Sequence, residues 1–66
     1  MFDREALQKF IDENGIKQKY ISAQTGIEET ALSKILSGSR KCEVNEYLLI
    51  CKALRVKPDK FIRKDV

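Results

Sequence analysis

The sequence predicts an all-α fold, a compact domain of five short helices. Apolar residues recur three and four positions apart along most of its 66 residues, which is the spacing of one helix face. Short breaks containing Gly15, Gly26 or Gly38 separate these stretches, and no stretch alternates apolar and polar residues as a strand would. A chain of this length forms one domain, so we expect a single unit over 1–66.

Caps and breaks set the helix boundaries. Asp3 is a favourable N-cap for the first helix, and the glycines allow the left-handed conformation that ends a helix. Pro58 fits the first turn of a last helix, where its missing N–H leaves no hydrogen bond unmade. The predicted helices span 3–14, 17–24, 28–36, 44–54 and 58–62.

Aliphatic side chains on the inner faces of these helices form the predicted core. Its central members are Ile21, Leu32, Ile35, Leu48 and Leu54. The apolar stripe of the 44–54 helix is predicted to comprise Val44, Tyr47, Leu48, Cys51 and Leu54. We also expect Tyr20 and Tyr47 to lie in or beside the core, and Phe61 and Ile62 to anchor the last helix.

The net charge of +3 is unevenly distributed. Residues 1–14 hold two basic and four acidic side chains, a net charge of −2, whereas residues 15–66 hold eleven basic and six acidic ones, a net charge of +5. The longer segment is therefore the better candidate for contacting an anion. A late basic cluster is expected to be solvated surface: Lys52, Arg55, Lys57, Lys60, Arg63 and Lys64.

Several functional classes lack the residues they need. The two cysteines, Cys42 and Cys51, have no C-x-x-C spacing and there is no histidine, which argues against a zinc site and against a disulfide framework. No phosphate-binding glycine loop or nucleophile motif occurs, so we expect no enzyme, no catalytic residue and no cofactor. The longest apolar run, 47–51, is too short to span a bilayer, and we expect a cytoplasmic protein.

The stretch from about 17 to 36 carries the functional signal. Two short helices meet at a sharp turn around Gly26, where the small Ser22 allows a close crossing. The exposed side of the second helix carries Glu29, Thr30, Ser33 and Lys34, a polar face with mostly short side chains. Such a face suits a helix that lies in the major groove of DNA.

This stretch resembles the helix-turn-helix of the phage Cro/repressor-type family, also called XRE-like. The family has Gln at the start of the motif, an aliphatic-small pair, a turn Gly followed by an aliphatic residue, and later a Gly followed by basic residues. The matching positions are Gln18, Ile21-Ser22, Gly26-Ile27, Leu32, Ile35, Gly38, Arg40 and Lys41, and residues 53–61 resemble the family's downstream segment. The resemblance covers residues 3–62 and implies a lambda repressor-like fold.

Departures from the family pattern are few. The family often pairs an Arg in its first helix with a Glu at the end of the recognition helix, and Ile11 and Leu36 stand at the matching positions. We expect a hydrophobic contact to replace that ion pair, a change that can be neutral or stabilising. The family's Pro near Cys42 and its Gly near Arg55 are also missing.

The motif and the resemblance together divide the candidate residues into two groups. Residues on the exposed face of the 28–36 helix are predicted to contact bases, and residues at the start of the motif or after it are predicted to contact phosphates. The base group is Glu29, Thr30, Ser33 and Lys34; the phosphate group is Lys17, Gln18, Ser37, Ser39, Arg40 and Lys41. Glu28 and Glu29 either complement the positive end of the helix dipole or, for Glu29, accept a hydrogen bond from cytosine.

The predicted function is sequence-specific binding of double-stranded DNA by a transcriptional regulator, a repressor or Cro-like protein. A domain this small makes few base contacts, so we expect a homodimer on a palindromic operator. Apolar candidates for the dimer contact lie near the end of the chain: Phe61, Ile62 and Val66. The alternative is an interaction module on the same fold, such as an antitoxin-like protein that binds a partner protein.

Overall fold

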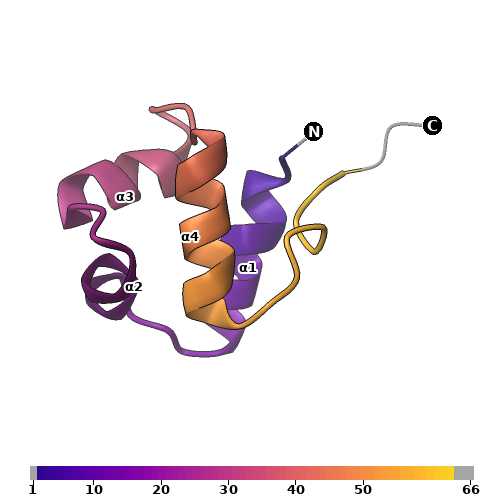
Figure 1. Ribbon diagram of the computed structural model, residues 1–66, viewed down its shortest axis with the longest axis horizontal. Helices are drawn as coiled ribbons and strands as arrows, with labels where there is room; N and C mark the ends of the chain where they lie inside the picture. Colours follow the sequence, from indigo (N-terminus) through magenta and orange to yellow (C-terminus); the bar gives the residue numbers. More distant parts are fainter. Residues whose placement is uncertain (1, 64–66) are drawn as a thin grey trace.

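The computed structural model describes residues 2–63, which contain four helices joined by short loops (Figure 1). Each of the first four predicted helices is confirmed, with boundaries that differ by at most one residue. They are α1 (Arg4–Glu13), α2 (Gln18–Thr25), α3 (Glu29–Ser37) and α4 (Val44–Leu54). None of them is long and apolar enough to cross a membrane. Lys64 of the basic cluster and Val66 of the dimer prediction lie outside the described residues.

Capping by Asp3 and the conformation of two glycines set the helix boundaries, as the sequence indicates. Oδ1 of Asp3 accepts a hydrogen bond from the Ala6 amide at 3.1 Å and so caps α1. Gly26 and Gly38 have φ angles of 79° and 85° and end α2 and α3 in the left-handed conformation, which residues with a Cβ adopt only with strain.

Hydroxyl groups fix the turn between α2 and α3. Ser22 donates its hydroxyl to the Ile27 carbonyl, which joins α2 to the residues just before α3. The Thr25 hydroxyl donates to the Ile21 carbonyl at 2.7 Å and accepts from the Ile27 amide at 3.1 Å. These bonds hold the two helices of the motif at one relative orientation.

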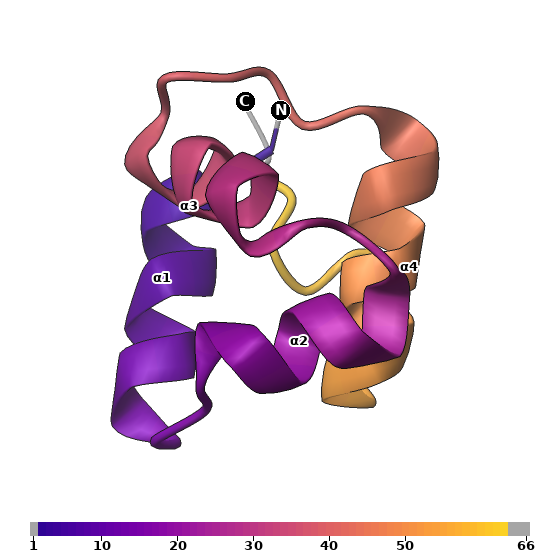
Figure 2. The ribbon, with the colours of Figure 1, turned by 90° about the vertical axis from the view of Figure 1, so that its left-hand side faces the viewer.

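The core fills the space enclosed by the four helices. Figure 2 shows α1 and α4 on either side, α2 crossing below and α3 above. Three of the five core predictions, Ile21, Leu32 and Ile35, are confirmed. The buried residues are Leu7, Ile11, Ile21, Ile27, Leu32, Ile35, Leu36, Tyr47, Ile50, Cys51 and Phe61.

The predicted stripe on α4 was partly wrong. Leu48 is 47% exposed and Val44 is 76% exposed, whereas Ile50 is fully buried. The buried face follows Tyr47, Ile50 and Cys51, with Leu54 only partly buried. Because residues 47–51 are all apolar, helical spacing alone allows more than one face, and packing against the other helices selects this one.

Tyr20 also departs from the prediction. Its side chain is 48% exposed, so it belongs to the surface and not to the core. Ile21, the next residue along α2, occupies the buried position. Because neighbours on a helix point about 100° apart, the narrow buried stripe of this short helix has no room for both.

The fifth predicted helix, 58–62, is absent, and a turn takes its place. The Lys60 and Ile62 amides donate to the carbonyls three residues earlier, at 3.1 and 3.3 Å. The Tyr47 hydroxyl donates to the Pro58 carbonyl and accepts from the Phe61 amide, which buries the Phe61 side chain. Ile62 instead forms an isolated antiparallel bridge with Phe2 and stays 40% exposed. These bonds to distant partners compete with helical ones.

Candidate functional site

The exposed face of α3 presents the four residues predicted to contact bases. Glu29, Thr30, Ser33 and Lys34 are all exposed, and their spacing places them on one side of the helix. Leu32, Ile35 and Leu36 hold the opposite side in the core. The polar face is therefore carried on a helix whose position is fixed by packing and by the Ser22 and Thr25 bonds.

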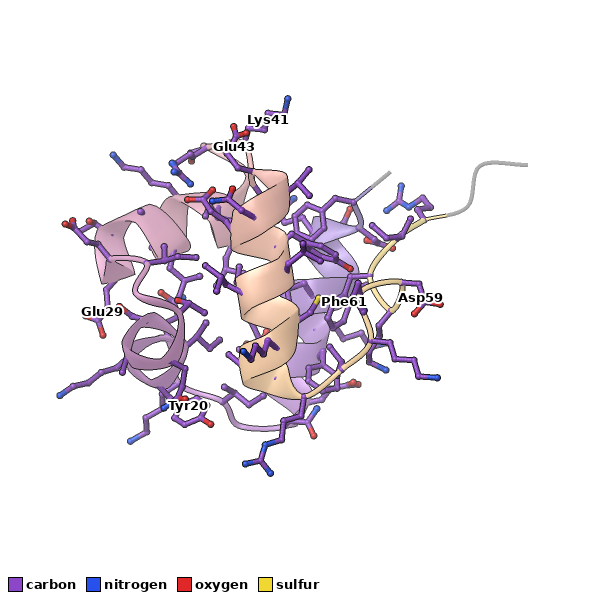
Figure 3. All side chains as sticks on the ribbon, viewed as in Figure 1. Tyr20, Glu29, Lys41, Glu43, Asp59 and Phe61 are labelled. Atoms are coloured by element: carbon purple, nitrogen blue, oxygen red, sulfur yellow. The ribbon has the colours of Figure 1, made fainter. Side chains whose placement is uncertain are left out.

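The start of α3 is acidic and open. Glu28 is the N-cap residue, but its side chain makes no capping hydrogen bond, and Glu29 lies in the first turn. Figure 3 shows the Glu29 side chain projecting at this end of the helix. A carboxylate in the first turn is favoured by the helix dipole, and an exposed one can also accept from a base, so both interpretations of Glu29 fit its position.

The start of α2 is a second open helix end. Lys17 is its N-cap residue and provides no side-chain cap, and Gln18 is the first helical residue and partly exposed. The first backbone N–H groups of a helix have no partner within it, so an uncapped start can donate to an anion. Lys17 and Gln18 stand beside these donors.

The last residue of α3, Ser37, and the loop between α3 and α4 hold the remaining phosphate candidates. The Ser37 hydroxyl donates to the Lys34 carbonyl at 3.1 Å and lies 2.9 Å from the Ser39 hydroxyl. The amides of Ser39 and Arg40 both donate to the Lys34 carbonyl, at 2.9 and 3.2 Å. The loop is therefore an ordered continuation of α3. Figure 2 shows it running along the top of the molecule, with the start of α2 at the lower left.

Arg40 and Lys41 differ in their partners. Arg40 forms a two-point ion pair with Glu46, at 3.0 and 2.8 Å, and Glu46 also accepts from the Glu43 amide at 3.0 Å. The Arg40 hydrogen bonds and then the Glu43 amide lower the pKa of the Glu46 carboxyl. Lys41 is exposed and has no ion pair within the described residues, and Figure 3 shows it at the outer edge of the loop.

Arg4 supports α3, a role that the sequence alone did not predict. Its Nη1 donates to the Leu36 carbonyl at 2.8 Å, at the end of α3, where a cation complements the helix dipole. No short-range pattern links α1 to a backbone carbonyl 32 positions away. Ile11 and Leu36, expected to replace an ion pair by an apolar contact, are both buried in the same core cluster.

The chain was also compared with known proteins. Residues 6–63 match a family model described as the Cro/C1-type HTH DNA-binding domain. Searches of curated proteins and of solved structures gave no match. The matched segment begins inside α1 and extends through the turn after α4, so it includes all of α2, α3 and α4 and all but the first two residues of α1.

Proposed function

Because the chain belongs to the family of Cro/C1-type helix-turn-helix DNA-binding domains, we propose that it reads a specific sequence of double-stranded DNA and regulates transcription, as a repressor or Cro-like protein. The observation that carries this proposal is the face of α3. Four neighbouring polar side chains are exposed on a helix whose other side is locked into the core. A rigid helix with this face can enter the major groove and present hydrogen-bonding groups to base edges.

Two other segments would hold the DNA backbone. The uncapped start of α2, with Lys17 and Gln18, offers backbone and side-chain donors to one phosphate region. Ser37 at the end of α3, with Ser39 and Lys41 in the loop after it, would contact another phosphate region. Arg40 would contribute less than Lys41, because its guanidinium is already neutralised by Glu46.

The DNA partner would be a palindromic operator bound by two copies of the chain. One α3 helix reads only a few base pairs, so specific binding requires a second half-site about one helical turn away. Phe61 is buried in its own chain and Ile62 is 40% exposed, which leaves Ile62 as the better of these two candidates for contact between copies.

A matched pair of lysines tests the proposal. Lys34 on α3 and Lys41 in the loop are both exposed, and replacing either by Ala removes one positive charge. Selection of bound duplexes from a random library, at a stated salt concentration, gives each variant's sequence preference. Lys34→Ala should change the preferred base at one position, with a loss of about 1–3 kcal/mol on the original site. Lys41→Ala should weaken all duplexes alike and reduce the salt slope by about 0.9.

The same selection separates the alternative function. If the wild-type chain enriches no sequence and its weak duplex binding is insensitive to salt, α3 does not read DNA. The exposed, acidic start of α3 would then favour a partner protein at the same face.

A further inference from the structure

Two adjoining hollows on the molecular surface share Tyr20. One, of about 550 Å³, lies between α2 and the loop that precedes it and is also lined by Lys17 and Lys19. The other, of about 220 Å³, lies between α2 and α4 and is also lined by Leu49, Lys52 and Arg55. Tyr20 is 48% exposed and Leu49 is 41% exposed, so solvent reaches at least one large apolar side chain in each hollow. We call this region the Tyr20 surface.

The rim of the Tyr20 surface is positive and unneutralised. Lys17, Lys19, Lys52 and Arg55 line the two hollows, and no acidic residue lines either one. Within the described residues, none of these four side chains forms an ion pair or a hydrogen bond. The Tyr20 surface therefore combines positive charge with apolar side chains, because four cations surround Tyr20 and Leu49.

Arg55 adds a second, conformational observation. It is the only residue other than glycine, among those described, that has a positive φ angle, 58°. Glycine takes this left-handed conformation more easily than a residue with a Cβ. A cation therefore occupies a position where the backbone favours glycine, and backbone strain of this kind concentrates at functional sites.

The Tyr20 surface lies away from the proposed DNA-reading face. In Figure 3, Tyr20 projects from the lower side of α2, whereas α3 lies above α2. The proposed contacts to the duplex come from the exposed face of α3, the loop that follows it and the start of α2, and they do not include Tyr20, Leu49 or Lys52. Lys17 alone belongs to both regions.

We propose that the Tyr20 surface docks an acidic segment of another protein, one that carries at least one large apolar side chain among its carboxylates. The apolar side chain would pack on Tyr20 and Leu49, in the manner of a buried interface anchor. Carboxylates beside it would pair with Lys19, Lys52 and Arg55, which favours acidic partners and speeds association. This interaction goes beyond DNA binding and does not require α3.

A second copy of the chain fits this surface poorly. Two Tyr20 surfaces facing each other across a two-fold axis would oppose four cations with four cations. The acidic helix α1 could supply carboxylates, but the exposed large apolar residues of the described chain are Tyr20, Val44, Leu48, Leu49 and Ile62, none of which lies on α1. Duplex DNA fits poorly as well, since its phosphates offer no partner to the apolar side chains of Tyr20 and Leu49.

The test is a titration of the ¹⁵N-labelled full chain, followed by amide chemical shifts. The probe is a short peptide of Asp and Glu residues around one Phe and one Leu; its control has Ser in place of the Phe and the Leu. We expect shifts confined to residues 15–24 and 49–55, which line the two hollows, and affinity about tenfold weaker for the Ser control. The same titration with a DNA duplex, and with increasing concentrations of the chain alone, should leave Leu49, Lys52 and Ala53 unshifted.

Three variants make the result specific. Tyr20→Ala and Lys52→Glu should each weaken the peptide about tenfold. Lys57→Glu is the matched control: Lys57 is exposed, lines neither hollow and undergoes the same charge change, so it should alter affinity by less than about twofold. Tyr20→Ala should leave duplex binding unchanged, which separates this proposal from the function of α3.

Four results would overturn the proposal. They are no binding of the acidic peptide, equal binding of the Ser control, equal losses in Lys52→Glu and Lys57→Glu, and shifts at the Tyr20 surface caused by the duplex or by the chain itself. Shifts caused by the duplex would assign the surface to nucleic acid, and shifts caused by the chain itself would assign it to self-association.

Discussion

Arg4 and Leu36 are joined across 32 positions of sequence by a hydrogen bond from the Arg4 guanidinium to the Leu36 carbonyl, 2.8 Å long. The same guanidinium passes over Gly38, where a Cβ would lie 2.9 Å from Nε of Arg4. The Arg4 side chain of the first helix therefore binds the last turn of α3 and lies close to the glycine that ends it. This contact adds to the core packing and to the Ser22 and Thr25 bonds in positioning the proposed reading helix.

Substitution of Gly38 should reveal the contact. Gly38→Ala should destabilise the fold by about 2 kcal/mol. About 1 kcal/mol is the left-handed backbone strain of any residue with a Cβ, and the rest is the Arg4–Leu36 hydrogen bond, which is lost when the flexible Arg4 side chain moves away from the added Cβ. Gly15→Ala is the control, since φ is 61° there and nothing lies within 4 Å of the added Cβ; it should lose only the strain. In an Arg4→Ala background the excess at Gly38 should vanish. Denaturant unfolding measures all four variants, and equal losses at Gly15 and Gly38 would contradict the argument.

Two neighbouring positions on α4 should respond very differently to truncation. Ile50→Ala removes a fully buried side chain and should reduce the free energy of unfolding by about 2–5 kcal/mol. Leu48→Ala removes one that is 47% exposed and should change it by less than about 1 kcal/mol. Thermal melting of the two variants decides this, and the reverse order would mean that the buried face of α4 has been misassigned.

The Arg40–Glu46 ion pair should make the free energy of unfolding depend on pH. Hydrogen bonds from Arg40, and then from the Glu43 amide, hold the pKa of Glu46 below its ordinary value of 4.5 in the folded state. The pair's contribution is therefore complete above that ordinary value and is lost as the pH falls through the lower, folded pKa. Glu46→Gln should melt at a lower temperature at neutral pH and lose less on acidification. The pKa of Asp3 is also lowered, chiefly by the hydrogen bond from the Ala6 amide. Glu46→Gln should therefore still lose some stability on acidification, through Asp3.

The two thiols should be slow to alkylate. Burial, and then the charge of Glu46, raises the pKa of Cys42 to about 11, and burial also raises the pKa of Cys51. Alkylation requires the thiolate, so Cys42 should react with iodoacetamide on the order of a hundredfold more slowly than a free thiol at neutral pH. Cys51, 1% exposed, should react only after unfolding. Mass spectrometry with and without denaturant gives both rates; a Cys42 rate equal to that of a free thiol would refute the first expectation.

Substitution of Arg55 should raise the free energy of unfolding and weaken binding of the acidic peptide. Arg55→Gly relieves the strain of the left-handed conformation and should raise the free energy of unfolding by about 1 kcal/mol. It also removes a cation from the Tyr20 surface, so the acidic peptide should bind more weakly. Melting and peptide titration on the same sample measure the two effects, and a variant that loses stability would show that the side chain itself supports the fold.

The sequence was sufficient for local structure and insufficient for contacts between distant segments. Capping by Asp3 and the breaks at Gly26 and Gly38 depend on nearby residues, so the bounds of α1 to α4 could be predicted. The face of α4 could not, because five consecutive apolar residues allow more than one stripe. Pro58 favoured a helix, but the Tyr47 hydroxyl and the bridge to Phe2 produce a turn.

The candidate site followed the same division. The reading face of α3 could be predicted because the apolar residues of this helix face the core, which leaves its polar residues on the exposed side. The roles of Arg4 and Glu46 could not, because Arg4 acts on a carbonyl of another helix and Glu46 reaches back to a loop. Such pairings depend on the assembled fold.

The bridge between Phe2 and Ile62 has a practical consequence for handling the molecule. It places the segment before α1 beside the segment after α4, and Figure 1 shows both on the side opposite α3. A fluorophore, an affinity tag or a sensor-chip tether attached within either of these two segments would therefore lie on the side of the molecule opposite α3. Immobilised in this way, the chain would present α3 to its target without obstruction.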